Sequence, residues 1–196
     1  GRLEAYDDKG VLANRVVETT PGRILQAQIL PNPSFENWTN IIPGVDEPAD
    51  WVCTNRLCSP FFGNNPQEVF QTTGPDAISG SYGVKISTIV LTSNPFAGTI
   101  PDTISFMFTG TIQGTSSIAQ GFAYAGIPDT LNFWFKYSPS GIDTGNMFFQ
   151  MWRSSMSDGS TVQVAGGSWE VDTTTTNYTL MKVPITYVDS DIPDSA

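Results

Sequence analysis

A strict alternation of side-chain types over residues 131–137 constrains the fold of this chain more than any other feature. In the sequence LNFWFKY, the odd positions hold Leu, Phe, Phe and Tyr, and the even positions hold Asn, Trp and Lys. A period of two is typical of a half-buried strand. A second aromatic run, residues 146–152 (NMFFQMW), follows a loop that contains Asp143. We therefore expect these two strands to form the centre of an antiparallel sandwich.

The composition supports an all-β chain with many loops. Apolar residues make up 39% of the 196 residues and aromatic residues 12%, which is enough for a sizeable core, whereas charged residues reach only 14%. Gly, Pro, Ser, Thr and Asn are abundant, and no long run of helix formers occurs. The length fits one large domain, or one domain with an arm.

The strand-prone segments are spaced as in a sandwich, and nine to eleven strands are expected. Residues 1–22 are predicted to be an N-terminal arm or extra strand, and residues 23–196 the sandwich. After residues 34–38 the chain is predicted to be irregular as far as about residue 74, in a long region that holds several prolines. Besides the central pair, the predicted strands are residues 15–19, 23–30, 84–91, 103–111, 118–124, 161–164, 168–171 and 178–187.

The charge balance and the missing histidine exclude several functions. Nine Lys and Arg against nineteen Asp and Glu give a net charge of −10. Such a surface repels phosphate backbones, so nucleic acid is not an expected partner. The sequence contains no stretch of ~18 apolar residues, the length that a membrane-spanning helix needs, so no membrane span is expected. The chain has no His, which excludes Ser-His-Asp and Cys-His catalysis, and no acid pair lies in a recognisable glycosidase motif. We expect no enzyme activity.

Two cysteines, Cys53 and Cys58, lie close together in the sequence. A metal site would need more Cys or some His. The spacing favours a short disulfide loop in an oxidising compartment, and two partly buried free thiols are the alternative.

Nine short segments between residues 30 and 196 carry a resemblance to known modules. In chain order they are residues 32–38 (NPSFENW), 48–51 (PADW), 79–85 (SGSYGVK), 121–124 (GFAY), 128–131 (PDTL), 135–139 (FKYSP), Asp143, 178–187 and 193–196 (PDSA). The first three segments are similar to the opening of galactose-binding-like jelly-roll modules, the architecture of many carbohydrate-binding modules. All nine together resemble the putative carbohydrate-metabolism domain and related jelly rolls of surface and secreted Bacteroidota proteins, which are often exported by the type IX route.

This resemblance implies a two-sheet antiparallel jelly roll at an extracellular or cell-surface location. It implies a non-catalytic binding or adhesion module, for which carbohydrate is the favoured ligand and a glycan or cell-surface molecule the partner. In similar jelly rolls the acid that matches Glu36 helps to bind a structural calcium ion. Backbone carbonyls near residues 79–81 could complete that site. The alternative for Glu36 is a surface acid or a turn cap.

Three further residues are candidate ligand contacts. The flat rings of Trp134 and Trp152 could stack on sugars, because aromatic faces bind the apolar faces of pyranose rings. The alternative is that both are core or rim residues of the sandwich. Asp143 could bind a cation or a sugar, or could form a turn with its own backbone.

The resemblance also suggests a second class of function. Family members usually continue past the motif that matches residues 193–195 into further strands. An N-terminal arm together with an open sheet edge is what strand exchange requires. The alternative hypothesis is therefore a structural subunit of a surface filament or adhesin that self-associates through strand edges and the arm.

Overall fold

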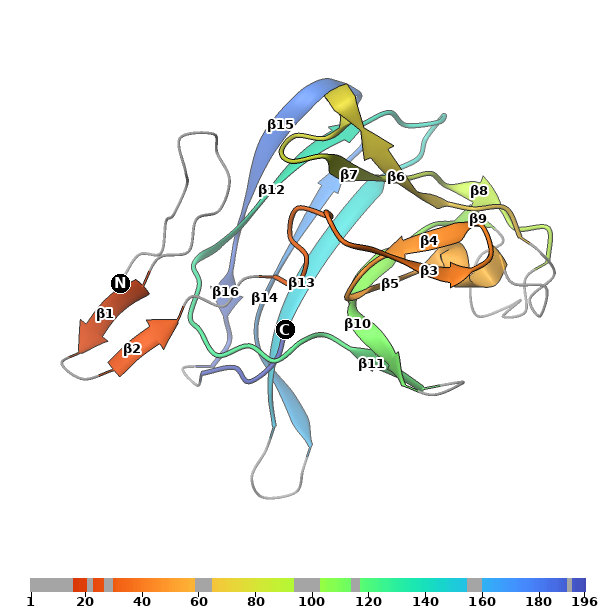
Figure 1. The fold of residues 1–196 in the computed structure, drawn as a ribbon. Coiled ribbons are helices and arrows are strands. Elements are labelled where there is room, and N and C mark those ends of the chain that lie inside the picture. Colours follow the sequence, from red (N-terminus) through yellow and green to blue (C-terminus); the bar gives the residue numbers. More distant parts are fainter. Residues whose placement is uncertain are drawn as a thin grey trace. The chain divides into compact units, whose positions relative to one another are not determined.

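The computed structural model shows an all-β protein, as predicted (Figure 1). It describes the backbone of residues 16–20, 23–26, 30–58, 65–93, 103–113, 117–154, 160–189 and 192–196. Within these ranges the regular elements are antiparallel strands and short 3-10 helices, and there is no α-helix. The described part accordingly holds no helix that could cross a membrane.

The chain divides into two compact units, which we describe separately. One unit combines residues 1–28 with residues 123–196, and the other consists of residues 29–122.

The unit of residues 29–122 is built from small antiparallel sheets. Strands β3 and β4 form a hairpin around Pro43 and Gly44, whose positive φ of 84° suits glycine. Strand β5 pairs with β10, which also pairs with β11, while β6 pairs with β7 and β8 with β9. The elements are β3 (Trp38–Ile42), β4 (Val45–Pro48), β5 (Trp51–Cys53), η1 (Thr54–Cys58), β6 (Val69–Thr73), η3 (Gly74–Asp76), β7 (Tyr82–Ile86), β8 (Ile89–Val90), β9 (Thr103–Ile104), β10 (Met107–Gln113) and β11 (Ser117–Gln120).

Two sequence predictions for this unit were wrong. The region from residue 39 to about 74 is not one irregular segment, because its described turn residues connect short strands. The predicted strand 84–91 is broken between β7 and β8, where the N–H of Ser87 donates to the carbonyl of Glu68 (2.8 Å). That hydrogen bond ties the break to the start of β6.

A buried asparagine joins three segments of this unit. The side-chain amide of Asn55, in η1, donates to the backbone carbonyls of Asp46 (2.8 Å) and Val69 (2.6 Å). Its side-chain oxygen accepts the N–H groups of Glu68 (3.1 Å) and Val69 (2.8 Å). Asn55 is fully buried, so all four bonds form away from water. The residue therefore links β4, η1 and the start of β6.

The other unit contains the strands predicted to be central. Strand β12 (Thr130–Tyr137) pairs with β15 (Thr175–Pro184). Strand β13 (Gly145–Ser154) pairs with β14 (Thr161–Val171), and β14 also pairs with β16 (Thr186–Tyr187). The alternation over residues 131–137 and the aromatic run 146–152 are thus both strands, but they lie in different sheets.

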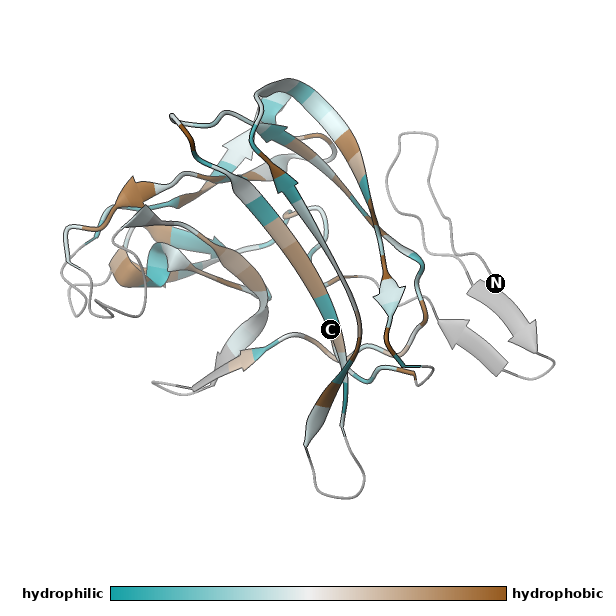
Figure 2. Ribbon diagram, turned by 180° about the vertical axis from the view of Figure 1, so that it is seen from behind, coloured by the Kyte–Doolittle hydropathy of each residue, from teal (hydrophilic) through white to brown (hydrophobic). Residues whose placement is uncertain are grey.

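The inner faces of these two sheets contact one another. The ring centroids of Phe133 and Phe135, on β12, lie 5.4 and 4.4 Å from that of Trp169, on β14. Met151, Val164 and Ala165 form the buried core beside them. Figure 2 shows an apolar run along the middle of β13. The outward residues of β12 and β13 remain exposed or half-buried, as a period of two requires.

Strand β14 is continuous, although the sequence predicted two short strands separated by Ala165-Gly166-Gly167. The prediction failed because these glycines allow close backbone contacts rather than a turn. A Cβ on Gly167 would lie 2.6 Å from the carbonyl oxygen of Pro184, and one on Gly166 would lie 2.9 Å from that of Phe149. The strand needs glycine here to admit its neighbours.

Two terminal segments complete this unit. Strands β1 (Val16–Thr20) and β2 (Arg23–Gln26) form a hairpin that spans the predicted boundary at residue 22, and the domain boundary itself stays a prediction. At the other end Ser195 bridges Ala123 and Trp152 in antiparallel fashion. A side-chain oxygen of Asp194 accepts the N–H of Ser154 (2.8 Å), and this hydrogen bond lowers the pKa of Asp194.

We expect Asn55→Ala to lower the free energy of unfolding by about 3 kcal/mol, because it leaves several buried backbone groups without partners. Urea denaturation measures the change. The matched control is Asn40→Ala, which removes an exposed asparagine that also bonds the backbone and a side chain. Equal effects of the two substitutions would contradict the role assigned to Asn55.

Candidate functional site

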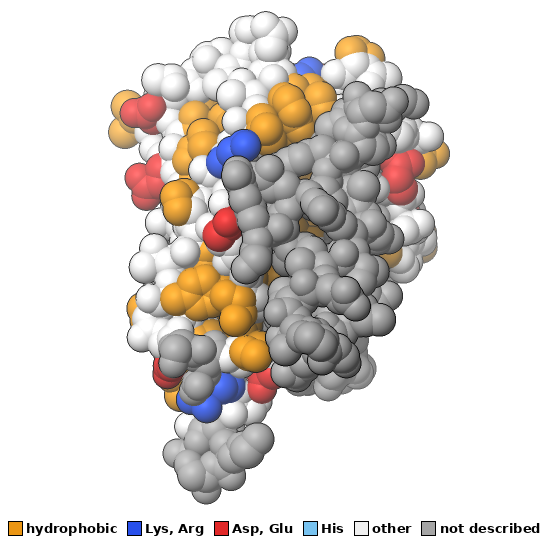
Figure 3. All heavy atoms as spheres, turned by 90° about the vertical axis from the view of Figure 1, so that its left-hand side faces the viewer, with side chains coloured by type: hydrophobic (Ala, Val, Ile, Leu, Met, Phe, Trp, Pro, Cys, Tyr) orange, Lys and Arg blue, Asp and Glu red, His pale blue; other side chains and the backbone are white. Residues whose placement is uncertain are grey.

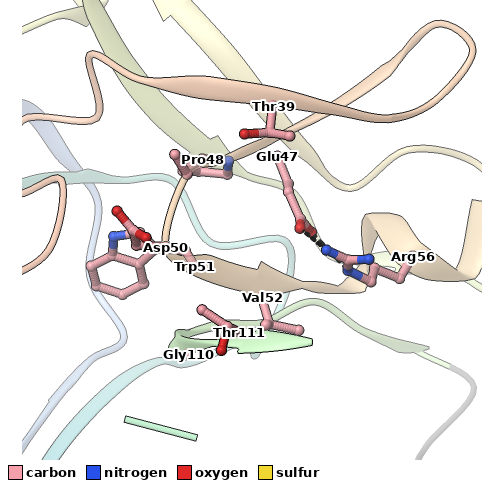
Figure 4. A pocket seen from close by; sticks show the side chains of 10 residues that line it. Thr39, Glu47, Pro48, Asp50, Trp51, Val52, Arg56, Gly110 and Thr111 are labelled. Atoms are coloured by element: carbon pink, nitrogen blue, oxygen red, sulfur yellow. Dashed lines mark hydrogen bonds and ion pairs between the residues drawn. The ribbon is translucent and has the colours of Figure 1, made fainter. Parts of the chain in front are cut away.

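A pocket of about 160 Å³ lies in the unit of residues 29–122 (Figure 4). Its polar and aromatic side chains come from β3, β4, the turn between β4 and β5, β5, η1 and β10. They are Thr39, Glu47, Asp50, Trp51, Arg56 and Thr111. A cavity of this size holds about one six-membered ring, since an engineered cavity of about 150 Å³ admits benzene.

An ion pair forms one wall of the pocket. The guanidinium of Arg56 donates from Nε to Oε2 of Glu47 (3.1 Å) and from Nη2 to Oε1. Burial raises the pKa of Glu47, and the hydrogen bond and charge of Arg56 oppose that rise. The side chain of Arg56 is 35% exposed. Because Glu47 fixes one edge of the guanidinium, its remaining N–H groups are held in a defined orientation.

The turn before β5 supplies the opposite wall. Asp50 is exposed and has a positive φ of 67°, and its carbonyl accepts the N–H of Gly110 (3.0 Å). Aspartate tolerates this left-handed conformation better than most residues. The indole N–H of Trp51 donates to the carbonyl of Pro31 (3.0 Å), and its ring lies 5.4 Å from that of Phe35. The aromatic ring beside Asp50 is therefore fixed before a ligand arrives.

The pocket combines a ring, a carboxylate, a guanidinium and two hydroxyl groups. Pockets of this composition orient a small ligand through a few polar groups against an aromatic surface. A larger hollow of about 310 Å³ lies beside Thr144, Glu170, Val171 and Asp172 in the other unit. Its lining offers two carboxylates but no ring or cation. The pocket of about 160 Å³, which we call the Trp51 pocket, is therefore the better candidate.

The structure does not bring the three predicted ligand residues together. Trp134 lies on β12, opposite Leu180 of β15, and is 39% exposed. Asp143 precedes β13, whereas Trp152 lies near the end of that strand, roughly 23 Å from its first residue at 3.3 Å per residue.

Figure 3 shows one face of the molecule, on which separate groups of hydrophobic side chains lie beside single charged side chains.

Asp143 and Trp152 each contact backbone groups of this unit, and ligand binding by either residue stays a prediction. A side-chain oxygen of Asp143 accepts the N–H of Thr144 (3.0 Å), which is the turn-forming alternative. Its carboxylate also raises the pKa of Tyr137, after the larger effect of burial. The backbone of Trp152 pairs with Ser195, and its side chain is half-buried.

Glu36 meets backbone donors at the position where calcium was predicted. Its carboxylate accepts the N–H groups of Ser81 (3.0 Å) and Tyr82 (3.0 Å). Gly80 has a positive φ of 70°, and a Cβ there would collide with this carboxylate. The described residues contain no group of three or more His, Cys, Asp or Glu side chains that could hold a metal ion. Calcium binding by Glu36 stays a prediction.

The two cysteines are free thiols, and the disulfide predicted from their spacing is absent from the structure. Each thiol lies beside a different buried carboxylate. The Sγ of Cys53 lies 3.8 Å from Oε2 of Glu47, and burial followed by this charge raises its pKa to about 12. Burial, together with the charge of Glu68, also raises the pKa of Cys58.

Glu68 is the most deeply buried carboxylate among the described residues, with 1% of its surface exposed. Burial raises its pKa, and the nearby hydroxyls of Thr54 and Ser105 partly oppose the rise. Neither hydroxyl reaches full hydrogen-bond geometry with the carboxylate.

The sequence did not single out the residues that line the pocket. Trp51 was part of the motif of residues 48–51, but Trp134 and Trp152 were preferred to it as sugar-stacking rings, and Arg56 was not considered. One signal was available, because Arg56 is the single charged residue between Cys53 and Cys58. A cation in a short segment that is otherwise buried needs a partner, and Glu47 provides it.

We expect both thiols to be unreactive toward Ellman's reagent at pH 8 in the folded protein, because burial keeps them protonated. After unfolding in concentrated guanidinium chloride without reductant, two thiols per chain should react. No reaction after unfolding would show that the disulfide predicted from the sequence forms.

We expect Glu68→Gln to become more stable relative to the wild type as the pH rises from 4 to 7. Because the pKa of Glu68 is raised, the folded state keeps the proton on this carboxyl group to a higher pH than the unfolded state does. The stabilisation that protonated Glu68 gives the wild type is therefore complete at low pH and is lost as the pH rises through the folded-state pKa. Urea denaturation at several pH values measures the difference. Asn55→Ala is the control, because it removes no titrating group. A difference independent of pH would contradict the assignment.

Searches against protein-family models, curated proteins and solved structures found no match. The functional assignment of the chain therefore depends on the geometry of its described residues.

Proposed function

We propose that this chain is a non-catalytic extracellular binding module and that it holds one sugar ring of a glycan in the Trp51 pocket. The observation that carries the proposal is a cavity of about 160 Å³ whose lining includes Trp51, Asp50 and the Glu47–Arg56 ion pair (Figure 4). Thr39 and Thr111 add hydroxyl groups at the rim.

The chemistry of a sugar matches this arrangement. A pyranose ring has apolar C–H faces and an edge of hydroxyl groups that both donate and accept hydrogen bonds. The indole of Trp51 suits the face, the carboxylate of Asp50 accepts from hydroxyls, and the free N–H groups of Arg56 donate to them. Charge-assisted hydrogen bonds of this kind are stronger than neutral ones.

The pocket supports binding rather than hydrolysis. A glycosidase needs one carboxyl group that delivers a proton and a second that acts as nucleophile or base. Both oxygens of Glu47 accept from Arg56, so neither is free to deliver a proton to a substrate. Glu47 serves instead to position the guanidinium.

The jelly-roll topology and the location are part of the same proposal. Strand β12 pairs with β15, and the two strands that lie between them in the sequence, β13 and β14, pair with each other. This nested pairing is what a long β-hairpin gives when it folds back on itself. This order supports a jelly roll. The extracellular or surface location follows from the resemblance to secreted Bacteroidota modules.

We expect Asp50→Asn and Thr111→Val each to weaken glycan binding, the former by roughly tenfold, equal to about 1.4 kcal/mol. A glycan array identifies the ligand, and isothermal titration calorimetry measures its dissociation constant. Asp172→Asn, an exposed acid in the other unit, is the control and should leave the affinity unchanged.

Two results would contradict the proposal. If glycan binding is unchanged in the pocket variants but lost in Trp134→Ala, the binding site is at Trp134, as predicted from the sequence, and not at the Trp51 pocket. Absence of binding to every glycan on the array would remove the carbohydrate function.

A further inference from the structure

Strand β13 has one side that no described strand covers. It is the edge strand of the sheet β13–β14–β16, and its ten residues pair with β14 on the other side. On the uncovered side, the described residues supply a partner at its C-terminal end alone. There the N–H of Trp152 donates to the carbonyl of Ser195 (2.8 Å), and its carbonyl accepts the N–H of Asp194 (2.9 Å).

The pairing of Trp152 shows which other backbone groups face this edge. In an antiparallel strand the N–H and carbonyl groups of alternate residues point to the same side. Because both groups of Trp152 point away from β14, those of Gln150, Phe148 and Asn146 do so as well. No described residue pairs with these backbone groups. The edge therefore offers three donors and three acceptors in a row.

This edge lacks the protection that exposed strands usually have. Natural edge strands carry charges or prolines that discourage pairing. Residues 145–152 (GNMFFQMW) contain neither, in a chain with a net charge of −10. The other long strands of this unit differ, since β12 contains Lys136 and β15 contains Lys182 and Pro184. The segment without charge or proline, residues 145–152, is thus the one at the edge of the sheet β13–β14–β16.

A large exposed ring marks the middle of the same edge. Phe148 is 73% exposed although its neighbours Met147 and Phe149 turn inward. Asn146 and Gln150 lie on either side of it on the outward face. The order Asn–x–Phe–x–Gln is close to symmetric about Phe148, and a strand of this kind can pair with a second copy of itself.

We propose that β13 pairs antiparallel with β13 of a second copy of this chain, with Phe148 on the two-fold axis. In this register Phe148 faces its counterpart, and Asn146 faces Gln150 of the other copy. The outward-facing backbone groups of the three residues then form six hydrogen bonds across the axis. The two aromatic rings cover one another, and the amide side chains pair at both ends.

The C-terminal segment limits the length of this contact. Ser195 occupies the position opposite Trp152, so the second copy has room only for residues 146–150. Such a short contact gives a reversible dimer whose population rises with concentration. Each copy carries a net charge of −10, so screening by salt strengthens the dimer.

Sedimentation velocity over a concentration series tests the proposal. The wild type should form a dimer that is tighter at about 0.5 M than at about 0.05 M NaCl. Phe148→Lys places a charge on the axis and should weaken the dimer at least tenfold. Gln150→Pro removes an outward N–H that no described residue of the same copy accepts, and should act in the same way. Circular dichroism melting shows whether each variant is folded.

A matched control and two contrary outcomes complete the experiment. Ser168→Lys adds the same charge beside Phe148 on the same face, but on the central strand β14, and should leave the dimer intact. A wild type that stays monomeric at sub-millimolar concentration overturns the proposal. A dimer that survives Phe148→Lys but disappears when residues 1–28 are deleted also overturns it, and favours strand exchange through the N-terminal arm.

Discussion

The carboxamide of Asn55 is the interaction on which the unit of residues 29–122 depends. It closes four backbone hydrogen bonds where β4, η1 and β6 meet. Asn65 does the same nearby, since its side chain bonds to the backbone of Leu57 (3.1 Å) and of Ser93 (2.8 Å). The strands of this unit are short and bury few large side chains. Two buried amides, rather than extensive apolar packing, therefore set the path of the connecting segments.

The same short helix places the pocket. Asn55 points into the interior, and the next residue, Arg56, reaches the pocket wall and its partner Glu47. Any movement of η1 would move the guanidinium as well, so the rigidity of the buried amide network also serves the binding site. The same segment also brings two buried carboxyl groups together. Glu47 and Glu68 lie close to the thiols of Cys53 and Cys58 and, after the larger effect of burial, raise the pKa of these thiols.

Much of the fold could be predicted from local patterns. The alternation over residues 131–137 and the aromatic run of residues 146–152 identified β12 and β13, because a period of two is a property of the strand itself. Which strands pair was not predictable, since pairing partners are distant in the sequence. Ala165-Gly166-Gly167 was misinterpreted for a related reason. A glycine that admits a neighbouring backbone cannot be distinguished from a turn glycine without knowing that neighbour.

The candidate site was harder to predict than the fold. Tryptophans 134 and 152 attracted attention as aromatic residues, but the pocket depends on Asp50 and Arg56, which become neighbours only through a hairpin and a 3-10 turn. The resemblance implied carbonyls near residues 79–81 as partners of Glu36 in a calcium site, whereas the groups that meet Glu36 in the structure are the amides of Ser81 and Tyr82.

The position of Ala196 has a practical consequence. Ser195 is antiparallel to Trp152, and Ala196 packs against the core that contains Met151. The chain is thus directed along β13 toward Gly145. Any peptide joined to Ala196, such as a purification tag or a fusion partner, would be delivered along this same edge. The presence of a C-terminal tag therefore affects which surface is available in a binding or assembly experiment.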